Sequence, residues 1–199
     1  PTPAKGTLRF TTDAEEMAST ADFIQESVPE DLAIKRKVYT AISATAPADV
    51  IISSSTSGFM PTEMQKGMTH PERMLVGHPF NPVYLCPLVE VVGGVQTSDD
   101  NKIAAKAFYE SIGMHALMVR KEVPGHISDR LQEAMWREMA ALVDSGMTPL
   151  QVISAATKTN AEILGLFGDR GSLEVGKRAD LLIVQGNPLE DINTIGNVA

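Results

Sequence analysis

Two kinds of hydrophobic pattern alternate along the first 120 residues. Short apolar runs bounded by polar residues predict buried strands at 22–26, 50–52, 74–77, 88–92 and 115–120. Between them, apolar residues that recur every three or four positions predict helices. One of these is capped by Asp31 and carries Ile34, Val38 and Ile42 on its inner face. Strands that alternate with helices favour a mostly parallel sheet with helices on both faces, so the expected fold class is α/β.

Capping residues locate two further helices. The run Thr12–Glu15 has the pattern of a capping box, with Thr12 as the cap, and predicts the start of a short helix. Ser98 is a suitable cap for a helix that ends at Gly113, with Ile103 and Ala107 facing inward.

The pattern changes at Pro124-Gly125, so a domain boundary is expected near residue 123. A long helix should follow, with one apolar stripe formed by Ile127, Leu131, Met135 and Leu142. From residue 147 onward the chain predicts a small α/β tail. Its expected parts are a helix that starts at Thr148-Pro149, a short helix at 160–164 and a strand at 179–184.

Composition narrows the possible partners. The 199 residues carry a net charge of −8 and no cluster of Lys and Arg, which argues against a nucleic-acid partner. The longest apolar runs, such as 181–184, are far shorter than the roughly 20 residues that span a bilayer, so no membrane partner is expected. The single cysteine, Cys86, excludes an internal disulfide and suits a reducing compartment, which makes the cytoplasm the expected location.

His78 and Glu90 combine residue types that can carry chemistry. His78 ends a predicted strand, where open α/β sheets place their ligands, and Glu90 follows twelve positions later on another apolar strand. A carboxylate there would fix the imidazole tautomer and stabilise its protonated form. Oxidation of a secondary alcohol needs such a base, because the hydroxyl proton must be removed as a hydride departs. The pattern is also typical of a structural hydrogen-bonded pair, and spacing alone leaves both interpretations open.

The sequence around this pair resembles that of a known family. The segments Gly77–Pro82 and Leu88–Val92 look like the His-Glu signature of the 3-hydroxyacyl-CoA dehydrogenase family. The flanking segments Ser54–Phe59, Pro71–Arg73 and Asn81–Tyr84 are similar to its L-carnitine dehydrogenase branch. The resemblance covers residues 8–146, about 140 of the 199. It implies an NAD-dependent oxidation of a 3-hydroxy acid, in that branch L-carnitine to 3-dehydrocarnitine.

The resemblance also implies roles for individual residues. His78 corresponds to the general base, Glu90 to its partner and Ser57 to a hydroxyl that contacts both substrate and nicotinamide. Asn81 matches a residue on the nicotinamide side.

Glu30 and Lys35 match the family's remaining contacts with NAD. Without the resemblance, these two residues would be interpreted as an exposed ion pair at a helix start.

The segment Pro124–Arg130 resembles the beginning of the family's helical dimerisation domain, which makes a homodimer possible. Asp129 departs from the usual Asn and could help to recognise a cationic substrate, or could be a surface carboxylate. His126 stands where the family has Phe and is expected to be a packing variant.

The aromatic residues available to hold a trimethylammonium group are Phe59, Phe80, Tyr84 and Trp136. Tyr84 and Asp129 are the predicted substrate contacts, and Phe80 is expected in the core.

Two features set this chain apart from a whole dehydrogenase. No G-x-G-x-x-G occurs in it, so residues 1–123 are expected to form a partial Rossmann-type NAD-binding domain without its first strands, and the chain alone is expected to be impaired. Residues 124–146 are expected to begin the helical domain. Residues 147–199 form the tail, in which 147–198, with the run Gly171–Leu181, resembles the C-terminal end of a metal-dependent amidohydrolase. No metal ligands are predicted. The alternatives are therefore a fragment of a hydrolase or a non-catalytic remnant.

Overall fold

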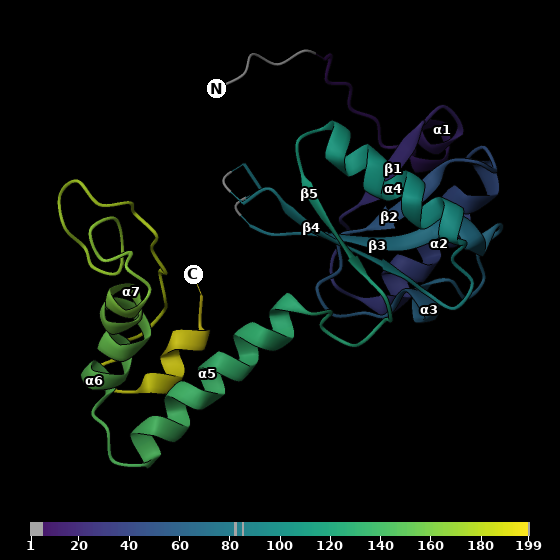
Figure 1. The fold of residues 1–199 in the computed structure, drawn as a ribbon. Helices are drawn as coiled ribbons and strands as arrows, with labels where there is room; N and C mark the ends of the chain where they lie inside the picture. Colours follow the sequence, from purple (N-terminus) through teal and green to yellow (C-terminus); the bar gives the residue numbers. More distant parts are fainter. Residues whose placement is uncertain (1–5, 82, 85, 199) are drawn as a thin grey trace. The chain divides into compact units, whose positions relative to one another are not determined.

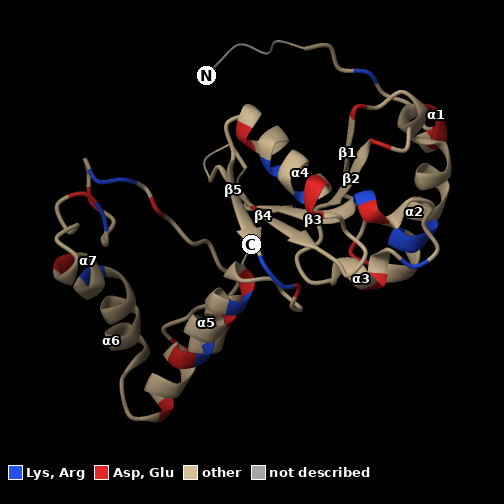
Figure 2. Cartoon of the chain, turned by 45° about the vertical axis from the view of Figure 1, so that its right-hand side comes forward, with Lys and Arg blue, Asp and Glu red and all other residues tan. Residues whose placement is uncertain are grey.

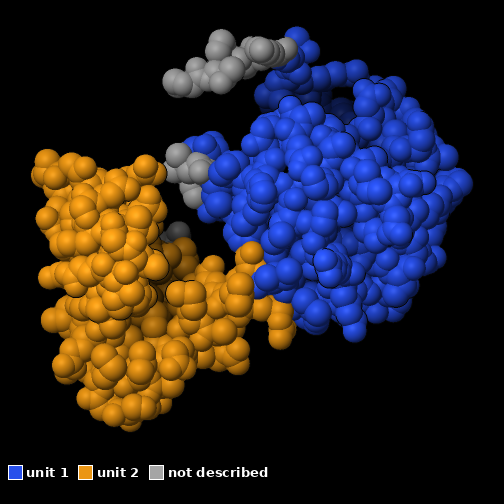
Figure 3. Space-filling model, viewed as in Figure 1, with its two compact units in different colours: residues 1–127 blue, residues 128–199 orange. Residues whose placement is uncertain are grey.

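The computed structural model describes residues 6–81, 83–84 and 86–198. Pro82, which belongs to the His-containing motif, lies outside the described residues. The chain divides into two compact units, residues 1–127 and residues 128–199 (Figure 3). Each unit is described by itself below.

The first unit is built on a five-stranded sheet with the order β1-β2-β3-β4-β5 (Figure 1). The strands are β1 (Phe23–Glu26), β2 (Ile51–Ser54), β3 (Met74–Pro79), β4 (Leu88–Gly93) and β5 (His115–Val119). All pairs of neighbours are parallel except β3 and β4, which are antiparallel. The five predicted strands are thus present, and the α/β fold class is confirmed.

Among the described residues of this unit, four α-helices and a short 3-10 helix accompany the sheet. They are α1 (Ala14–Ser19), α2 (Leu32–Thr45), α3 (Pro61–Met64), η1 (Pro71–Arg73) and α4 (Asp99–Ser111). The caps predicted for α2 and α4 are confirmed, since the side chains of Asp31 and Ser98 accept backbone N–H groups of the first turn. The cap predicted for α1 is wrong. Asp13 takes that place instead of Thr12, because its carboxylate accepts the N–H groups of Glu15 and Glu16.

Each face of the sheet is covered by a different helix. On one face α2 contributes Tyr39 and Ile42 to a core with residues of all five strands. On the other face α4 contributes Ala105 and Tyr109 to a second core. The sheet is therefore buried on both faces, as its continuous apolar strands require.

The predicted inner faces of these two helices are partly wrong. In α2 the buried stripe includes Lys35, Tyr39 and Ile42, whereas Ile34 is 43% exposed. In α4 the residues that face the sheet are Ala105 and Tyr109, while Ile103 is 62% exposed and Ala107 is also exposed. The apolar residues did not reveal the buried stripes, because polar groups in those stripes find hydrogen-bond partners in the interior.

The second unit is mostly helical. It contains α5 (Ser128–Asp144), α6 (Pro149–Ser154), the π-helix η2 (Ala155–Thr159), α7 (Asn160–Ile163) and the 3-10 helix η3 (Ile192–Gly196). Its small core centres on Met139, Val152 and Ile192. The predicted start of α6 is confirmed by a capping box between Thr148 and Gln151.

Leu131 and Met135, on the predicted apolar stripe of α5, are each 62% exposed, and Met139 is buried. One prediction for this unit is wrong, because the strand expected at 179–184 does not form. Leu181–Ile183 are more than half exposed, and Val184 makes an isolated bridge with Val198. A strand needs a neighbour of similar length, and no other segment described in this unit supplies one.

The exposed faces of the long helices carry charges of both signs (Figure 2). Within α4, Lys102 pairs with Asp99 and Lys106 with Glu110, at the three- and four-residue spacings that bring side chains together. None of the helices in the described part of the chain combines the length and the apolar character needed to cross a bilayer.

Arg73 is the largest fully buried side chain of the first unit. Its guanidinium donates to the carbonyls of Ser43 at 2.7 Å, Ala46 at 3.3 Å and Val50 at 3.4 Å, and to the carbonyl of Pro47. These carbonyls belong to the end of α2 and to the loop that leads into β2, and the helix itself leaves them without donors. Burial lowers the pKa of Arg73. One side chain thus satisfies the C-terminal end of a helix inside the protein.

Replacing this cation with an apolar residue tests its structural importance. Arg73→Met should lower the free energy of unfolding by about 3 kcal/mol, because several buried carbonyls lose their donor. Urea denaturation of the full chain measures this change. Arg36→Met is the matched control, since Arg36 bonds Glu63 at the surface, and it should cost less than about 1 kcal/mol. Equal losses in both variants would contradict the assignment.

Tyr109 joins α4 to three strands. Its hydroxyl lies 2.7 Å from the hydroxyl of Ser53 and donates to the side-chain carbonyl of Gln25 at 2.5 Å. Any Cβ at Gly77 would overlap the ring of Tyr109, so glycine is required there for this close approach. Burial raises the pKa of Tyr109 to about 12.

This raised pKa predicts a loss of stability at alkaline pH. The unfolded chain releases the phenolic proton near pH 10.0, before the folded chain does near pH 12, so stability should fall as the pH rises between these values. In Tyr109→Phe the fall should be smaller by about 2 kcal/mol, measured by urea denaturation across that range. Tyr84→Phe removes a side chain that is 86% exposed and should leave the profile unchanged. A profile in Tyr109→Phe identical to that of the wild type would refute this.

Candidate active site

The antiparallel pairing of β3 and β4 places His78 directly opposite Glu90. The imidazole Nδ1 lies 3.1 Å from the Glu90 Oε2. The relative exposure is 6% for His78 and 0% for Glu90, so the pair is buried. His78 nevertheless lies close to the edge of the sheet, because it is the penultimate residue of β3. The two strands bring the residues together because their apolar neighbours, Val76 and Val91 among them, fix the register in the core.

The carboxylate of Glu90 determines how the imidazole is presented. Its second oxygen accepts the backbone N–H of Ile127 at 3.0 Å. A carboxylate accepts and does not donate, so Nδ1 of His78 carries the proton in this pair and Nε2 is left as the acceptor. The arrangement therefore orients the imidazole so that its Nε2 can take a proton from a ligand.

Three of the predicted cofactor contacts follow the carboxyl ends of neighbouring strands. Glu30 comes after β1, Ser57 after β2 and Asn81 after β3, and all three are exposed. Because β1, β2 and β3 are parallel, their carboxyl ends share one edge of the sheet. His78 is the penultimate residue of β3, so the base lies at this edge as well. Ligands of open α/β sheets bind along such edges.

Thr56, which the sequence analysis did not single out, connects these loops. It is buried, and its hydroxyl donates to the carboxylate of Glu30. The same hydroxyl accepts the N–H groups of Gly58 at 3.3 Å and Phe59 at 3.0 Å. Burial works to raise the pKa of Glu30, but hydrogen bonds from Thr56 and Lys35 outweigh it and hold that pKa below its ordinary value. Thr56 thus shapes the turn that exposes Ser57 and keeps Glu30 ionised.

Lys35 is buried, with 1% exposure. Its ammonium lies 3.0 Å from Oε1 of Glu26 and 3.2 Å from Oε2 of Glu30, and it donates to the carbonyl of Val28 at 3.3 Å. The interpretation of Glu30 and Lys35 as an exposed ion pair is therefore wrong for the lysine.

Glu26 is the partner that the sequence analysis missed. It is 4% exposed and accepts from Lys35, from the backbone N–H of Val28, from the Ser54 hydroxyl at 2.7 Å and from the Tyr39 hydroxyl. Burial first, and then the Glu26 carboxylate, raise the pKa of Tyr39. One signal could have revealed this site. Ile24 and Glu26 are two residues apart on β1, so their side chains lie on the same face of the sheet and point into the same core.

His126 proves to be close to the candidate base. Its side chain is fully buried, its ring centroid lies 5.4 Å from that of His78, and its Nε2 lies 3.0 Å from the carbonyl oxygen of Thr56. The expected packing role therefore comes with a specific hydrogen bond beside the site.

The remaining predicted substrate contacts are more scattered. Phe80, expected in the core, is only half-buried and has its ring centroid 5.0 Å from that of His78. Tyr84 is 86% exposed, and Phe59 packs against the core under α2. Asp129 and Trp136 belong to α5, in the second unit.

The described residues suit one end of NAD. A polar sheet edge with a carboxylate, hydroxyl and amide beside a buried base fits the nicotinamide and its ribose. The Gly-rich turn that would hold the pyrophosphate is not among the 199 residues. Among the residues that the structure describes, no three His, Cys, Asp or Glu side chains come together as a metal site.

Comparison with known families gives two matches. Residues 2–123 match the family described as 3-hydroxyacyl-CoA dehydrogenase, NAD binding domain. Residues 98–198 match the amidohydrolase family, a wider range than the expected 147–198.

Curated relatives match most of the chain. An L-carnitine dehydrogenase from Pseudomonas aeruginosa is 53% identical over 84% of this chain and 52% of its own length. The L-carnitine dehydrogenase from Pseudomonas putida is 52% identical with the same coverage. The chain therefore spans about half the length of the curated relatives that it matches.

Solved structures agree with this relationship. A crystal structure of 5-formyl-3-hydroxy-2-methylpyridine 4-carboxylic acid 5-dehydrogenase, described as an NAD+ dependent dismutase, is 35% identical. It superposes with a TM-score of 0.71 over 78% of this chain and 50% of that protein.

Proposed function

The chain belongs to the 3-hydroxyacyl-CoA dehydrogenase family through residues 2–123 and to the amidohydrolase family through residues 98–198, and from this premise we propose that its first unit carries the proton-transfer site of an NAD-dependent dehydrogenase acting on a 3-hydroxy acid. The observation that carries the proposal is the buried pair of His78 and Glu90 at the carboxyl edge of the sheet.

His78 acts as the general base in this proposal. With Nδ1 bonded to Glu90, its Nε2 accepts the proton of the substrate's C3 hydroxyl as the carbonyl forms. The imidazolium that results lies against the Glu90 carboxylate, which stabilises its charge without moving. Glu90 therefore orients the base before the reaction and balances its charge afterwards. NAD, when bound, supplies the hydride acceptor.

The cofactor contacts are proposed for the loops after β1, β2 and β3. Ser57 and Asn81 would donate to or accept from the nicotinamide end, because both are exposed at the edge where His78 lies. Glu30 would bind on the same side, held ionised by Thr56 and Lys35. Lys35 lies beneath this edge, and its positive charge stabilises the ionised carboxylate of Glu30.

L-carnitine is the substrate that we propose, since the similar curated proteins carry that name. Oxidation at its C3 hydroxyl would yield 3-dehydrocarnitine. Its trimethylammonium group can be held against an aromatic face, and Phe80 is the aromatic ring beside His78 that has partial exposure. In this proposal the exposed Tyr84 covers the cation.

Replacing the base tests the proposed chemistry. His78→Gln should reduce carnitine oxidation by about 10²- to 10⁴-fold, because general base catalysis is lost. The binding of NADH, measured by titration calorimetry, should remain within a few-fold of the wild type. His115→Gln, which changes an exposed histidine on β5, is the control and should leave both quantities unchanged. Normal turnover in His78→Gln would refute the assignment.

Replacing the neighbouring ring tests the substrate. Phe80→Leu should raise KM for L-carnitine by about 5-fold, as expected for the loss of one cation–π contact, and should leave the dissociation constant of NADH unchanged. The steady-state rates with carnitine and with 3-hydroxybutyrate, which lacks the trimethylammonium group, separate recognition of the cation from general damage. Phe10→Leu, at a side chain that is 85% exposed, is the control. Equal effects on carnitine, 3-hydroxybutyrate and NADH would exclude Phe80 as the cation site.

A further inference from the structure

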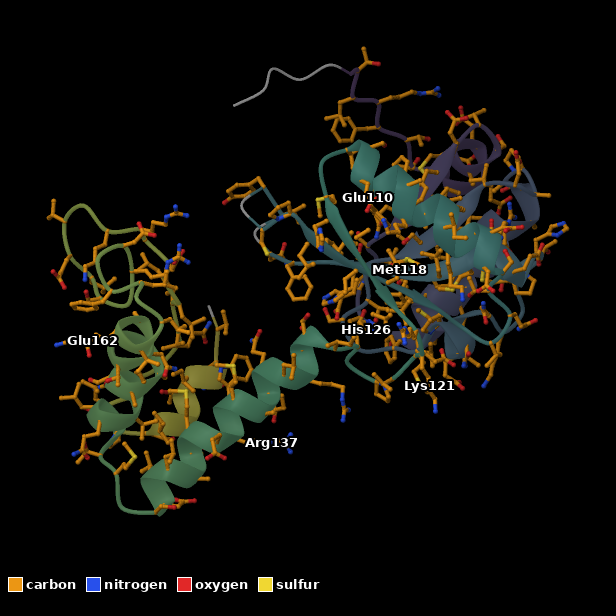
Figure 4. The ribbon with its side chains drawn as sticks, viewed as in Figure 1. Glu110, Met118, Lys121, His126, Arg137 and Glu162 are labelled. Carbon is orange, nitrogen blue, oxygen red and sulfur yellow. The ribbon has the colours of Figure 1, made fainter. Side chains whose placement is uncertain are left out.

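Three consecutive residues of the loop between β5 and α5, with His126 in the middle (labelled in Figure 4), make hydrogen bonds to the turn after β2 and to Glu90. The N–H of Gly125 donates to the carbonyl of Gly58 at 3.2 Å. His126 bonds the carbonyl of Thr56 through Nε2 at 3.0 Å, and the N–H of Ile127 donates to Glu90 at 3.0 Å. We name Gly125–Ile127 the clasp segment. It ties the turn after β2 to the partner of the base.

The geometry of His126 is demanding. Its φ of 49° lies in the left-handed region, which residues other than glycine rarely adopt, and Gly125 before it also has a positive φ, of 72°. The backbone keeps this strained conformation while the side chain is fully buried. The observed strain is therefore compensated by contacts that the imidazole makes inside the site.

The bond to Thr56 determines the tautomer of His126. A carbonyl oxygen can only accept, so Nε2 of His126 must carry a proton. His78 has the opposite arrangement, because its Nδ1 is protonated toward Glu90. The two adjacent imidazoles thus differ in function. One is held with Nε2 open to a ligand, and the other uses Nε2 as a structural donor.

Thr56 connects His126 to the residues proposed to contact the cofactor. Its carbonyl is held by His126, while its hydroxyl accepts the N–H groups of Gly58 and Phe59 and donates to Glu30. The residue between Thr56 and Gly58 is Ser57, whose position depends on this turn. A change at the carbonyl of Thr56 would therefore move both Ser57 and Glu30.

We propose that His126 is a positioning residue, whose Nε2–H holds the turn Thr56–Gly58 against the imidazole of His78 and so sets the distance between the base and the groups that contact the cofactor. The inference rests on the proposed function for its effect on turnover, and on the clasp segment alone for its effect on the turn. An aromatic ring without a donor would fill the same space but leave the Thr56 carbonyl without this partner.

Two substitutions separate the hydrogen bond from the packing. His126→Phe keeps a ring and removes the donor, whereas His126→Gln keeps a donor at a position close to that of Nε2. In His126→Phe the amide hydrogens of Gly58 and Phe59 should exchange about 10-fold faster with solvent, and kcat should fall about 10-fold because the reacting groups are misaligned. His126→Gln should restore both to within about 2-fold. His115→Phe, at an exposed histidine, is the matched control.

The measurements are amide exchange by NMR on the full chain, and kcat and KM for L-carnitine with NAD. Wild-type exchange rates in His126→Phe would overturn the proposal. Equal losses of exchange protection and of unfolding free energy in His126→Phe and His126→Gln would also overturn it, because they would indicate that His126 acts through packing alone. A wild-type chain that shows no turnover would contradict the proposed function, while the exchange rates would still decide whether His126 holds the turn.

Discussion

The carboxylate of Glu90 is the constraint on which the candidate site depends. A carboxylate with no exposure to solvent is stable in a protein only when donors surround it, because its desolvation costs several kcal/mol. Here the donors come from His78 on the adjacent strand and from the backbone of Ile127. The register of β3 on β4, which apolar packing fixes, brings one of these donors to the carboxylate, and the need to satisfy the buried charge determines the tautomer of the imidazole and the path of the chain after β5. A shift of one residue in that register would turn Glu90 to the opposite face of the sheet.

A second buried carboxylate organises the neighbouring part of the unit in the same way. Glu26, at the end of β1, collects donors from α2, from β2 and from its own loop. Lys35 connects it to Glu30, which lies at the surface. The sheet edge is therefore supported from below by ionised groups whose positions are determined by hydrogen bonds. Packing of apolar side chains alone would leave the exposed polar groups with more conformational freedom than a binding site tolerates.

The sequence predicted the strands and most helix starts well, because apolar runs such as Val50–Ile52 and caps such as Asp31 are local signals. It was less informative about which residues face inward. Ile34 was expected in the core and is exposed, whereas Lys35 beside it is buried. Lys35 can be buried because it pairs with Glu26, which lies on β1 and not on the same helix. The spacing of apolar residues within α2 cannot indicate a partner on another element. The strand expected at 179–184 failed for a similar reason, since strand formation requires a neighbour that local sequence does not reveal. Family resemblance located His78 and Glu90, but the bond between His126 and Thr56 spans 70 positions and needed the fold.

The antiparallel arrangement of β3 and β4 has a consequence for how the chain folds. Every parallel pair in this sheet requires a crossover before its strands can meet, whereas β3 and β4 are joined by residues 80–87 and can form a hairpin by themselves. The entropy lost in closing a loop grows with its length, so this contact is the least costly long contact of the sheet. If this hairpin forms first, the imidazole and the carboxylate meet while both are still hydrated, and water leaves Glu90 when the other strands and the loop after β5 close over it. That order of events would spare the chain a state in which a bare carboxylate is desolvated.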